Sequence, residues 1–250
     1  MKIRILSDLH LEFTQYQEGP FPSVGEDLVI LAGDIGVGVK GIQWARESFP
    51  GRDVVYVLGN HEFYKHDWSD LIPQAREAAD ASRVHFLEND KLDLGGVRIL
   101  GCSLWTDFAV MGRMLVADCR TVAQAEMADY KEIRKDHRKR KLLTADTIER
   151  CRQSYQWLDR EIREADRELV VVTHHAPTMA TTAPWNAILL SNAAFHNGFD
   201  ELIRPPVSLW IHGHTHTSMA VEFDDIPIVS NQRGYPGEGV TFSWDYCMEV

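Results

Sequence analysis

The sequence predicts a protein of the α/β class, and three observations lead to this prediction. Short, continuous runs of apolar residues recur along the chain, which is typical of strands buried on both faces of a sheet. Segments with apolar residues at helical spacing separate several of these runs. Clusters of Asp, Asn and His follow directly after five of the runs. Because the carboxyl ends of parallel strands in an open sheet face one crevice, we expect these clusters to meet there.

Strands and helices are expected to alternate in the first part of the chain. The expected strands cover residues 3–6, 28–31 and 54–58, and the expected helices cover residues 42–49 and 68–81. The polar residues after these strands are Asp8 and His10, then Asp34, then Asn60 and His61. Asp8 and His10 occupy alternate positions, so in extended backbone their side chains would project to the same side.

The second part of the chain continues this pattern after a longer charged region. Two glycines at positions 95 and 96 predict a hairpin over residues 92–102. Further strands are expected over residues 169–172, 208–211, 226–229 and 240–244, with a short helix near Phe199. The first of these strands ends at His174 and His175. The second ends at His214 and His216, which would also point the same way in extended backbone.

Residues 105–163 have helical character and a high density of charge. Within them, residues 131–141 carry seven lysines or arginines and two acids. This basic segment is interpreted either as a solvated helix face or as a rim that attracts an anionic substrate. We expect one domain over residues 1–250, in which residues 105–163 form a helical cap over the substrate entrance.

Composition and charge exclude several classes of protein. With 250 residues, of which 44% are hydrophobic and 25% charged, the chain is long enough for a well-buried core. Its net charge of −11 and pI near 5.4 argue against broad binding to nucleic acid or to an anionic membrane. The four cysteines form no CxxC pair, so we expect reduced thiols. No segment resembles a membrane span or a signal-peptide core, so a cytoplasmic protein is expected.

The side chains at the five strand ends together predict a metal site. Each motif alone is also explained by a polar turn or a capped strand, but five such ends in one crevice are hard to explain by packing. A set of Asp, Asn and His without thiolates suits Mn, Fe, Zn, Co or Ni, and the groups suffice for two ions, with Asp34 as a candidate bridge. Two ions about 3.5–4 Å apart are a common solution for phosphoryl chemistry.

The order of the motifs resembles the calcineurin-like metallophosphoesterase superfamily. The chain carries D-x-H, G-D, G-N-H-E, H and G-H-x-H between residues 8 and 216. The resemblance implies a four-layer α-β-β-α sandwich with a binuclear metal centre. It implies that a first ion is bound by Asp8, His10 and His216, that Asp34 bridges, and that a second ion is bound by Asn60, His174 and His214. It also implies that a metal-bridging hydroxide attacks phosphorus, while His61 protonates or stabilises the leaving oxygen.

One departure from the motifs of the superfamily narrows the expected class of substrate. Protein phosphatases of this superfamily extend the second motif to G-D-x-x-D-R-G, whereas Val37 and Gly38 stand here in place of the last Asp and Arg. The pattern is closer to bacterial phosphodiesterases, including those that act on nucleotides or cyclic nucleotides. The expected partner is therefore a small-molecule phosphodiester. A phosphomonoester of a small metabolite is the alternative, and a non-catalytic scaffold with the same fold is a third interpretation.

Further expectations concern substrate contacts and a rival enzyme class. Substrate contacts are expected from His175, Arg233 and Tyr235, and Trp185 and Asn186 are candidates to line the pocket. His174 rather than His175 is taken as the metal ligand because it stands where the strand ends. The rival class is a hydrolase of C–N bonds on a (β/α)₈ barrel, which would usually begin with H-x-H on its first strand rather than D-x-H.

Overall fold

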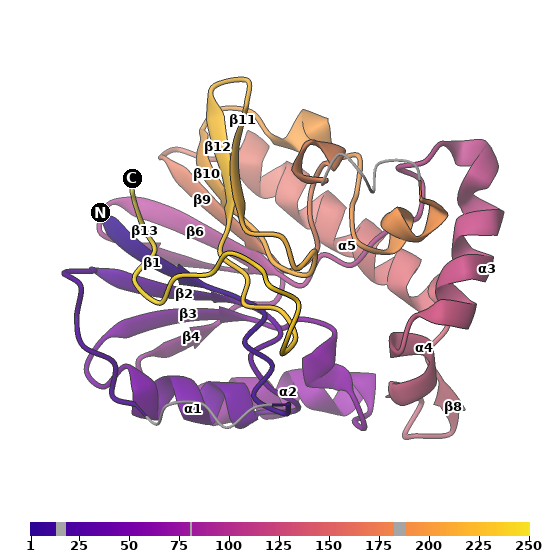
Figure 1. The fold of residues 1–250 in the computed structure, drawn as a ribbon. Helices are drawn as coiled ribbons and strands as arrows, with labels where there is room; N and C mark the ends of the chain where they lie inside the picture. Colours follow the sequence, from indigo (N-terminus) through magenta and orange to yellow (C-terminus); the bar gives the residue numbers. More distant parts are fainter. Residues whose placement is uncertain (14–18, 81, 183–188) are drawn as a thin grey trace.

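Two β-sheets packed face to face form the centre of the molecule, and helices cover their outer faces (Figure 1). The computed structural model describes residues 1–13, 19–80, 82–182 and 189–250. The strands of the two large sheets are β1 (Lys2–Leu6), β2 (Leu28–Ala32), β3 (Asp53–Val57), β4 (Val84–Phe86), β5 (Asp90–Leu94), β6 (Val97–Cys102), β9 (Leu169–Thr173), β10 (Val207–Ile211), β11 (Met219–Phe223), β12 (Ile226–Ser230) and β13 (Cys247–Glu249). The α-helices are α1 (Lys40–Ser48), α2 (Trp68–Ala79), α3 (Val116–Glu126), α4 (Asp129–Glu132) and α5 (Thr144–Arg163). Short 3-10 helices are η1 (His61–Phe63), η2 (Arg113–Leu115), η3 (Met179–Thr181), η5 (Leu190–Ala194) and η6 (Asp200–Leu202).

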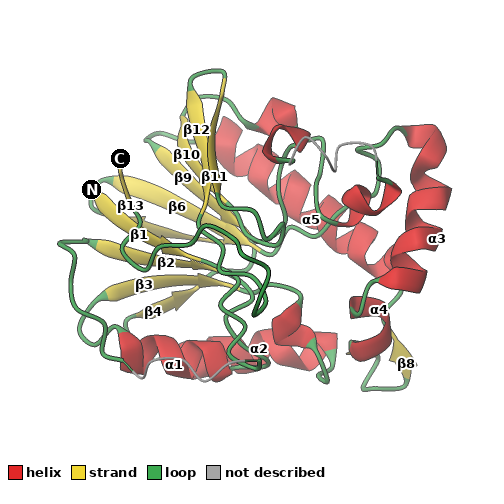
Figure 2. Cartoon of the chain, viewed as in Figure 1, coloured by secondary structure: helices red, strands yellow, loops and turns green. Residues whose placement is uncertain are grey.

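The first sheet has the strand order β13-β1-β2-β3-β4, in which β1 to β4 are parallel. Strands β1, β2 and β3 are buried on both faces, which explains their largely apolar sequences. In β2, Leu28 and Ile30 pack in the cluster between the sheets, whereas Val29 and Leu31 pack in the cluster that includes the helices. Helices α1 and α2 lie along the outer face of this sheet (Figure 2).

The second sheet has the order β11-β12-β10-β9-β6-β5, with parallel strands at its centre and antiparallel strands at both edges. Val170 and Val172 of β9 pack against the first sheet, whereas Val171 packs with the helices. Helix α5 covers the outer face (Figure 1). The predicted α-β-β-α sandwich is confirmed, and two separate sheets exclude the (β/α)₈ barrel.

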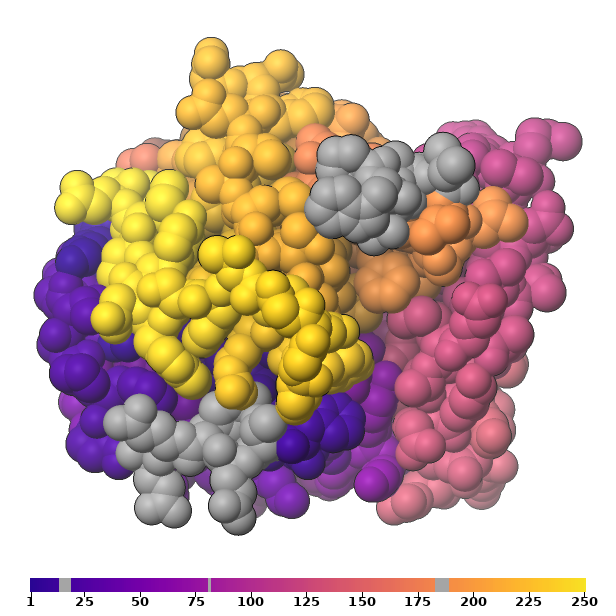
Figure 3. Space-filling model, in the orientation of Figure 1, coloured from indigo at the N-terminus to yellow at the C-terminus, as the bar shows by residue number. Residues whose placement is uncertain are grey.

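The last strand lies later in the chain than expected. The prediction of a strand over residues 240–244 is wrong, because the strand is β13, which pairs antiparallel with β1. Ser243 instead exchanges backbone hydrogen bonds with the side chain of Asn231, at 3.0 and 2.7 Å. These bonds take the place of strand pairing at this position. In Figure 3 this yellow C-terminal part of the chain lies against the indigo N-terminal part.

The basic segment, residues 131–141, is not one helix face as expected. After α4 the chain forms the small antiparallel hairpin of β7 (Arg134–Lys135) and β8 (Arg140–Lys141). Residues 136–138 between them all have positive φ angles, of 58°, 56° and 66°, which no helix allows. Asp146 of α5 pairs with Lys135 and Arg140, at 2.8 and 2.7 Å, and so ties the hairpin to the helix.

Other expectations from composition can be compared with the structure. All four cysteines are free thiols, as expected, and three of them are buried. Among the described residues, no helix combines the length and the apolar character needed to cross a membrane. The hairpin of β5 and β6 turns at Gly95 and Gly96, both with positive φ, as the sequence predicts.

Candidate metal centre

The polar strand ends come together, although not from a single open sheet as expected. Strands β1, β2 and β3 of the first sheet and β9 and β10 of the second end at the same side of the sandwich (Figure 1). The site therefore lies where the carboxyl edges of the two sheets meet. Three groups of His and Asp side chains gather there, and in each group the candidate ligand atoms lie within 4.8 Å of one another.

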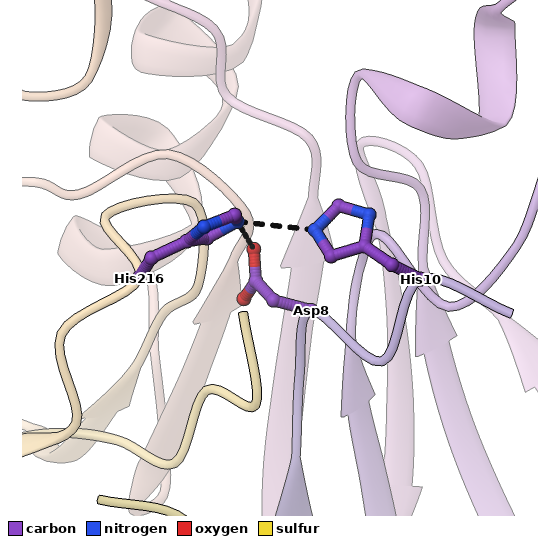
Figure 4. A group of neighbouring side chains, drawn as sticks. All are labelled: Asp8, His10 and His216. Carbon is purple, nitrogen blue, oxygen red and sulfur yellow. Dashed lines mark hydrogen bonds and ion pairs between the residues drawn. The ribbon is translucent and has the colours of Figure 1, made fainter. Parts of the chain in front are cut away.

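The first group consists of Asp8, His10 and His216 (Figure 4). The Nε2 atoms of the two histidines face each other at 3.0 Å, and Asp8 Oδ1 lies 3.5 Å from His216 Nε2. Asp8 and His10 are fully buried. Only one of the two facing nitrogens can donate a proton to the other, whereas a cation between them would satisfy both lone pairs and the carboxylate.

The second group consists of Asp34, His174 and His214, with Asn60 beside it. His174 Nε2 lies 3.5 Å from Asp34 Oδ1 and 3.0 Å from Asn60 Oδ1. His214 is buried, and its Nε2 has no hydrogen-bond partner among the described residues. An unpartnered imidazole nitrogen is costly in a protein interior. One ring nitrogen of His214 also lies within 4.8 Å of ligand atoms of Asp34 and His174, close enough for the three side chains to bind one metal ion.

Asp34 lies between the two groups. Its Oδ2 is 3.9 Å from His10 Nε2 and 4.0 Å from His61 Nε2, while its Oδ1 faces His174. The third group, His10, Asp34 and His61, overlaps the other two. One carboxylate thus faces both donor sets, as a bridging ligand must.

The carboxylates of the cluster favour positive charge on the two histidines His174 and His61, whereas burial lowers the pKa of His214. Burial lowers the pKa of His174, but the nearby Asp34 outweighs burial and raises it to about 10. The pKa of His61 is likewise lowered by burial and raised on balance, to about 9, by Asp34 and Glu12. Nitrogen and oxygen donors without thiolates, an orphaned imidazole nitrogen and a field that attracts cations together fit divalent metal ions.

A comparison with protein families identifies the group to which this geometry belongs. A family model described as calcineurin-like phosphoesterase matches residues 1–218, which include all of the clustered side chains. The chain belongs to the calcineurin-like phosphoesterase family. It is therefore a hydrolase that acts on phosphoric esters.

Two similar proteins share almost the whole length of this phosphoesterase. Uncharacterized protein L509 of Acanthamoeba polyphaga mimivirus is 26% identical over 269 residues, covering 96% of this chain and 94% of that protein. The crystal structure of phosphopantetheinyl hydrolase (PptH) from Mycobacterium tuberculosis superimposes with a TM-score of 0.71 at 18% identity, covering 100% of this chain and 95% of that one. At this identity the second likeness shows a common fold.

The backbone at the centre of the phosphoesterase differs from the extended backbone expected at the strand ends. Asp8, His10 and Asp34 have positive φ angles of 53°, 50° and 54°, and His214 and His216 have φ angles of 70° and 46°. The expectation of extended backbone is therefore wrong. Asp8 and His10 still come together as predicted, whereas His214 and His216 belong to different groups. Left-handed turns instead send His214 toward His174 and His216 toward His10. Such conformations cost about 1–3 kcal/mol each and concentrate at functional sites.

Glu62, the last residue of the G-N-H-E motif, holds together the loops that carry several candidate metal ligands of the phosphoesterase. Its Oε2 accepts hydrogen bonds from the backbone N–H of Asp34 (3.0 Å) and Gly59 (2.7 Å). Its Oε1 accepts from the N–H groups of Ile35 and Gly36 and from the Tyr56 hydroxyl. No role was predicted for this glutamate from the sequence, although its place directly after His61 was a signal.

Gly59 is required by the close packing between these loops. A Cβ atom at this position would lie 2.6 Å from the backbone nitrogen of Asp34 and 2.7 Å from the His174 ring. These separations are shorter than van der Waals contact, so any side chain would push the central carboxylate away from its histidines.

Three further carboxylates contact the proposed ligands of the phosphoesterase or His61, and sequence reasoning missed all of them. Asp129 of α4 accepts from Asn60 Nδ2 at 2.8 Å, which directs the amide oxygen of Asn60 toward His174. Glu238 lies 2.6 Å from His216 Nδ1. Glu12 contacts His10 and His61. Glu12 follows D-x-H closely in sequence, whereas the sequence holds no signal for the other two.

The expected substrate contacts occupy different places. The Tyr235 hydroxyl lies 2.8 Å from His61 Nε2, and the Tyr235 ring lies 4.5 Å from the His216 ring, so this residue borders the site. His175 is buried against His214 and hydrogen bonds to the Ser103 carbonyl. Arg233 is half-buried, and its backbone N–H donates to the Ser7 carbonyl. Trp185 and Asn186 lie outside the described residues.

Proposed function

We propose that this phosphoesterase hydrolyses phosphodiesters with the help of two divalent metal ions. The observation that carries the proposal is the position of Asp34 between two donor groups. The proposed ligands are Asp8, His10 and His216 for the first ion, Asn60, His174 and His214 for the second, and Asp34 for both. Ions such as Mn, Fe, Zn, Ni or Co in these places would neutralise phosphate charge and lower the pKa of bound water.

His61 is the proposed general acid. Its backbone N–H donates to Asp34 Oδ1 at 2.8 Å, and its ring stacks on Tyr64 with centroids 4.1 Å apart. These contacts fix the ring, and Nε2 faces Asp34 Oδ2 and the Tyr235 hydroxyl. A proton held at Nε2 would be transferred to the leaving oxygen of the ester. Tyr235 is proposed to contact that part of the substrate, and His175 and Arg233 remain candidate contacts.

The charge balance of the site supports a diester as substrate. Four carboxylates belong to the donor groups or contact their histidines, namely Asp8, Glu12, Asp34 and Glu238. Two divalent ions would balance these four negative charges and leave little excess positive charge. A monoester carries close to two negative charges near neutral pH, and a diester carries one. The second charge would be poorly compensated here, so the diester is favoured.

We also propose that residues 1–250 form one domain, with residues 105–163 as a cap that contributes to the site. Asp129 of this region is buried and reaches Asn60 directly. The free, mostly buried thiols support a reducing, cytoplasmic location.

The proposal is tested by assaying metal-stripped protein, reloaded in turn with Mn, Zn, Fe, Ni, Co or Mg, on a matched pair of aryl phosphate esters. We expect faster cleavage of the diester than of the monoester with a transition metal. Cyclic nucleotides would follow as substrates, together with a phosphopantetheinyl ester, which the name of the mycobacterial hydrolase suggests. Preference for the monoester would refute the diester assignment. Failure to bind metal would favour a non-catalytic scaffold.

A further inference from the structure

Glu12 links two histidines that have different proposed roles. Its Oε1 lies 2.8 Å from Nδ1 of His61 and 3.2 Å from Nδ1 of His10. Both rings are buried, and the Glu12 side chain is 18% exposed. Neither histidine therefore turns Nδ1 toward the metal ligands. In both rings the opposite nitrogen, Nε2, faces Asp34, at 4.0 and 3.9 Å.

We propose that Glu12 is the positioning residue for His61, an inference that rests on the proposed function of His61 as general acid. A carboxylate can only accept a hydrogen bond, so it requires a proton on the nitrogen that faces it. Glu12 thus fixes which edge of the ring is turned away from the substrate. His61 Nε2 is then presented to the leaving oxygen in a single orientation.

The surroundings of His61 support different roles for its two ring nitrogens, with Nδ1 held by Glu12 and Nε2 presented to the substrate. Tyr64 covers one face of the ring, and Tyr235 contacts Nε2 through its hydroxyl. Stacking alone does not distinguish the two orientations related by a 180° rotation of the ring about its bond to Cβ. Glu12 makes the distinction at Nδ1 and the Tyr235 hydroxyl supports it at Nε2, because rotation would turn each nitrogen away from its partner. In a largely buried site this hydrogen bond is stronger than it would be in water.

A competing role for Glu12 is support of His10 as a metal ligand. Carboxylates behind metal-bound histidines commonly tune metal affinity, and Glu238 makes such a contact with His216 Nδ1 at 2.6 Å. Glu12 Oε1 lies closer to His61 Nδ1, at 2.8 Å, than to His10 Nδ1, at 3.2 Å. The two roles predict different measurements. If Glu12 positions His61, its replacement alters the hydrogen bonding of the His61 ring. If Glu12 supports His10, its replacement releases metal.

The first test is NMR of the ring protons in zinc-loaded protein with ¹⁵N-labelled histidine. The signal of the His61 Nδ1 proton is identified as the one missing in His61→Ala. We expect this hydrogen-bonded proton far downfield in the wild type, and we expect it shifted upfield or lost in Glu12→Gln. Glu238→Gln is the matched control and should perturb His216 while leaving the His61 signal in place. An unchanged His61 signal in Glu12→Gln would overturn the proposal.

The second test uses phosphodiesters with leaving groups of increasing basicity. We expect kcat of Glu12→Gln to fall about 10- to 100-fold for an alkyl leaving group and much less for a nitrophenyl one, with KM and zinc content retained. Added to His61→Ala, the substitution should cause no further loss, because both changes remove one function. An equal loss for all leaving groups, together with lost zinc, would assign Glu12 to His10 instead.

The two tests separate the inference from the proposed function. If the wild-type protein cleaves no phosphodiester with any of the metals tested, the proposed function is wrong. The NMR experiment then still decides whether Glu12 holds the ring of His61.

Discussion

Replacement of Glu62 by Gln should destabilise the protein strongly, although the two side chains have nearly the same shape. Oε2 accepts hydrogen bonds from two backbone N–H groups, and Oε1 accepts from two more and from the Tyr56 hydroxyl. The four N–H groups can only donate. In Glu62→Gln one of the two oxygens is replaced by an amide NH₂. Whichever oxygen is replaced, at least two backbone N–H donors then face another donor instead of an acceptor. Burial and the nearby Asp34 raise the pKa of Glu62 to about 7, so the carboxylate is fully charged only at alkaline pH. There, hydrogen bonds to a charged group contribute about 1.5–3 kcal/mol each, so the loss should be about 3–6 kcal/mol.

This loss is a large share of the stability of a typical domain, which is about 5–15 kcal/mol. For a chain of this length it corresponds to a fall in Tm of about 6–24 °C. The measurement is urea unfolding of metal-free wild type and Glu62→Gln, followed by circular dichroism, so that metal binding does not contribute. Glu47→Gln on the exposed face of α1 is the control and should stay within about 0.5 kcal/mol of wild type. A Glu62→Gln protein as stable as this control would refute the reasoning.

Three further predictions concern the metal centre. Asp34→Ala should lose bound metal and most activity, because both donor groups lose a ligand; a fully active variant with two ions per chain would contradict the ligand assignment. His61→Ala should retain its metal but lose about 10²- to 10³-fold in turnover of esters with poor leaving groups, measured by steady-state kinetics. Chelation should lower the free energy of unfolding by about 4 kcal/mol per ion at ion concentrations of about 1,000 Kd, and an unchanged Tm would argue against bound ions.

The sequence predicted the parts of the centre that depend on local order along the chain. Asp34, Asn60 and His174 stand directly after apolar runs, and a run buried on both faces is recognisable from composition alone. The direction of each side chain was not predictable in this way. His214 and His216 diverge because of left-handed turns, and alternation in sequence suggested the opposite.

Contacts that depend on packing between distant segments could not be predicted from sequence patterns. Asp129 lies 69 residues from Asn60, in the region expected to form a helical cap, yet it orients the amide of Asn60. The basic segment was expected to be helical. The expectation failed because a high density of charge carries no information about the direction of the backbone. Its turn is instead fixed by Asp146 and by Asp67, which accepts the backbone N–H of Arg138 at 2.7 Å.

The proposed ligands are divided between the two sheets, and this division has a consequence for how the protein matures. Asp8, His10, Asp34 and Asn60 follow strands of the first sheet, whereas His174, His214 and His216 follow strands of the second. A nascent chain that has emerged only as far as α2 carries four of these seven groups and no partner sheet. Neither donor group is complete until the chain beyond position 214 has been synthesised and the sheets have docked. With the proposed ligands, the centre can therefore be completed only after most of the chain has been synthesised, and ions bound earlier would meet an incomplete set of ligands.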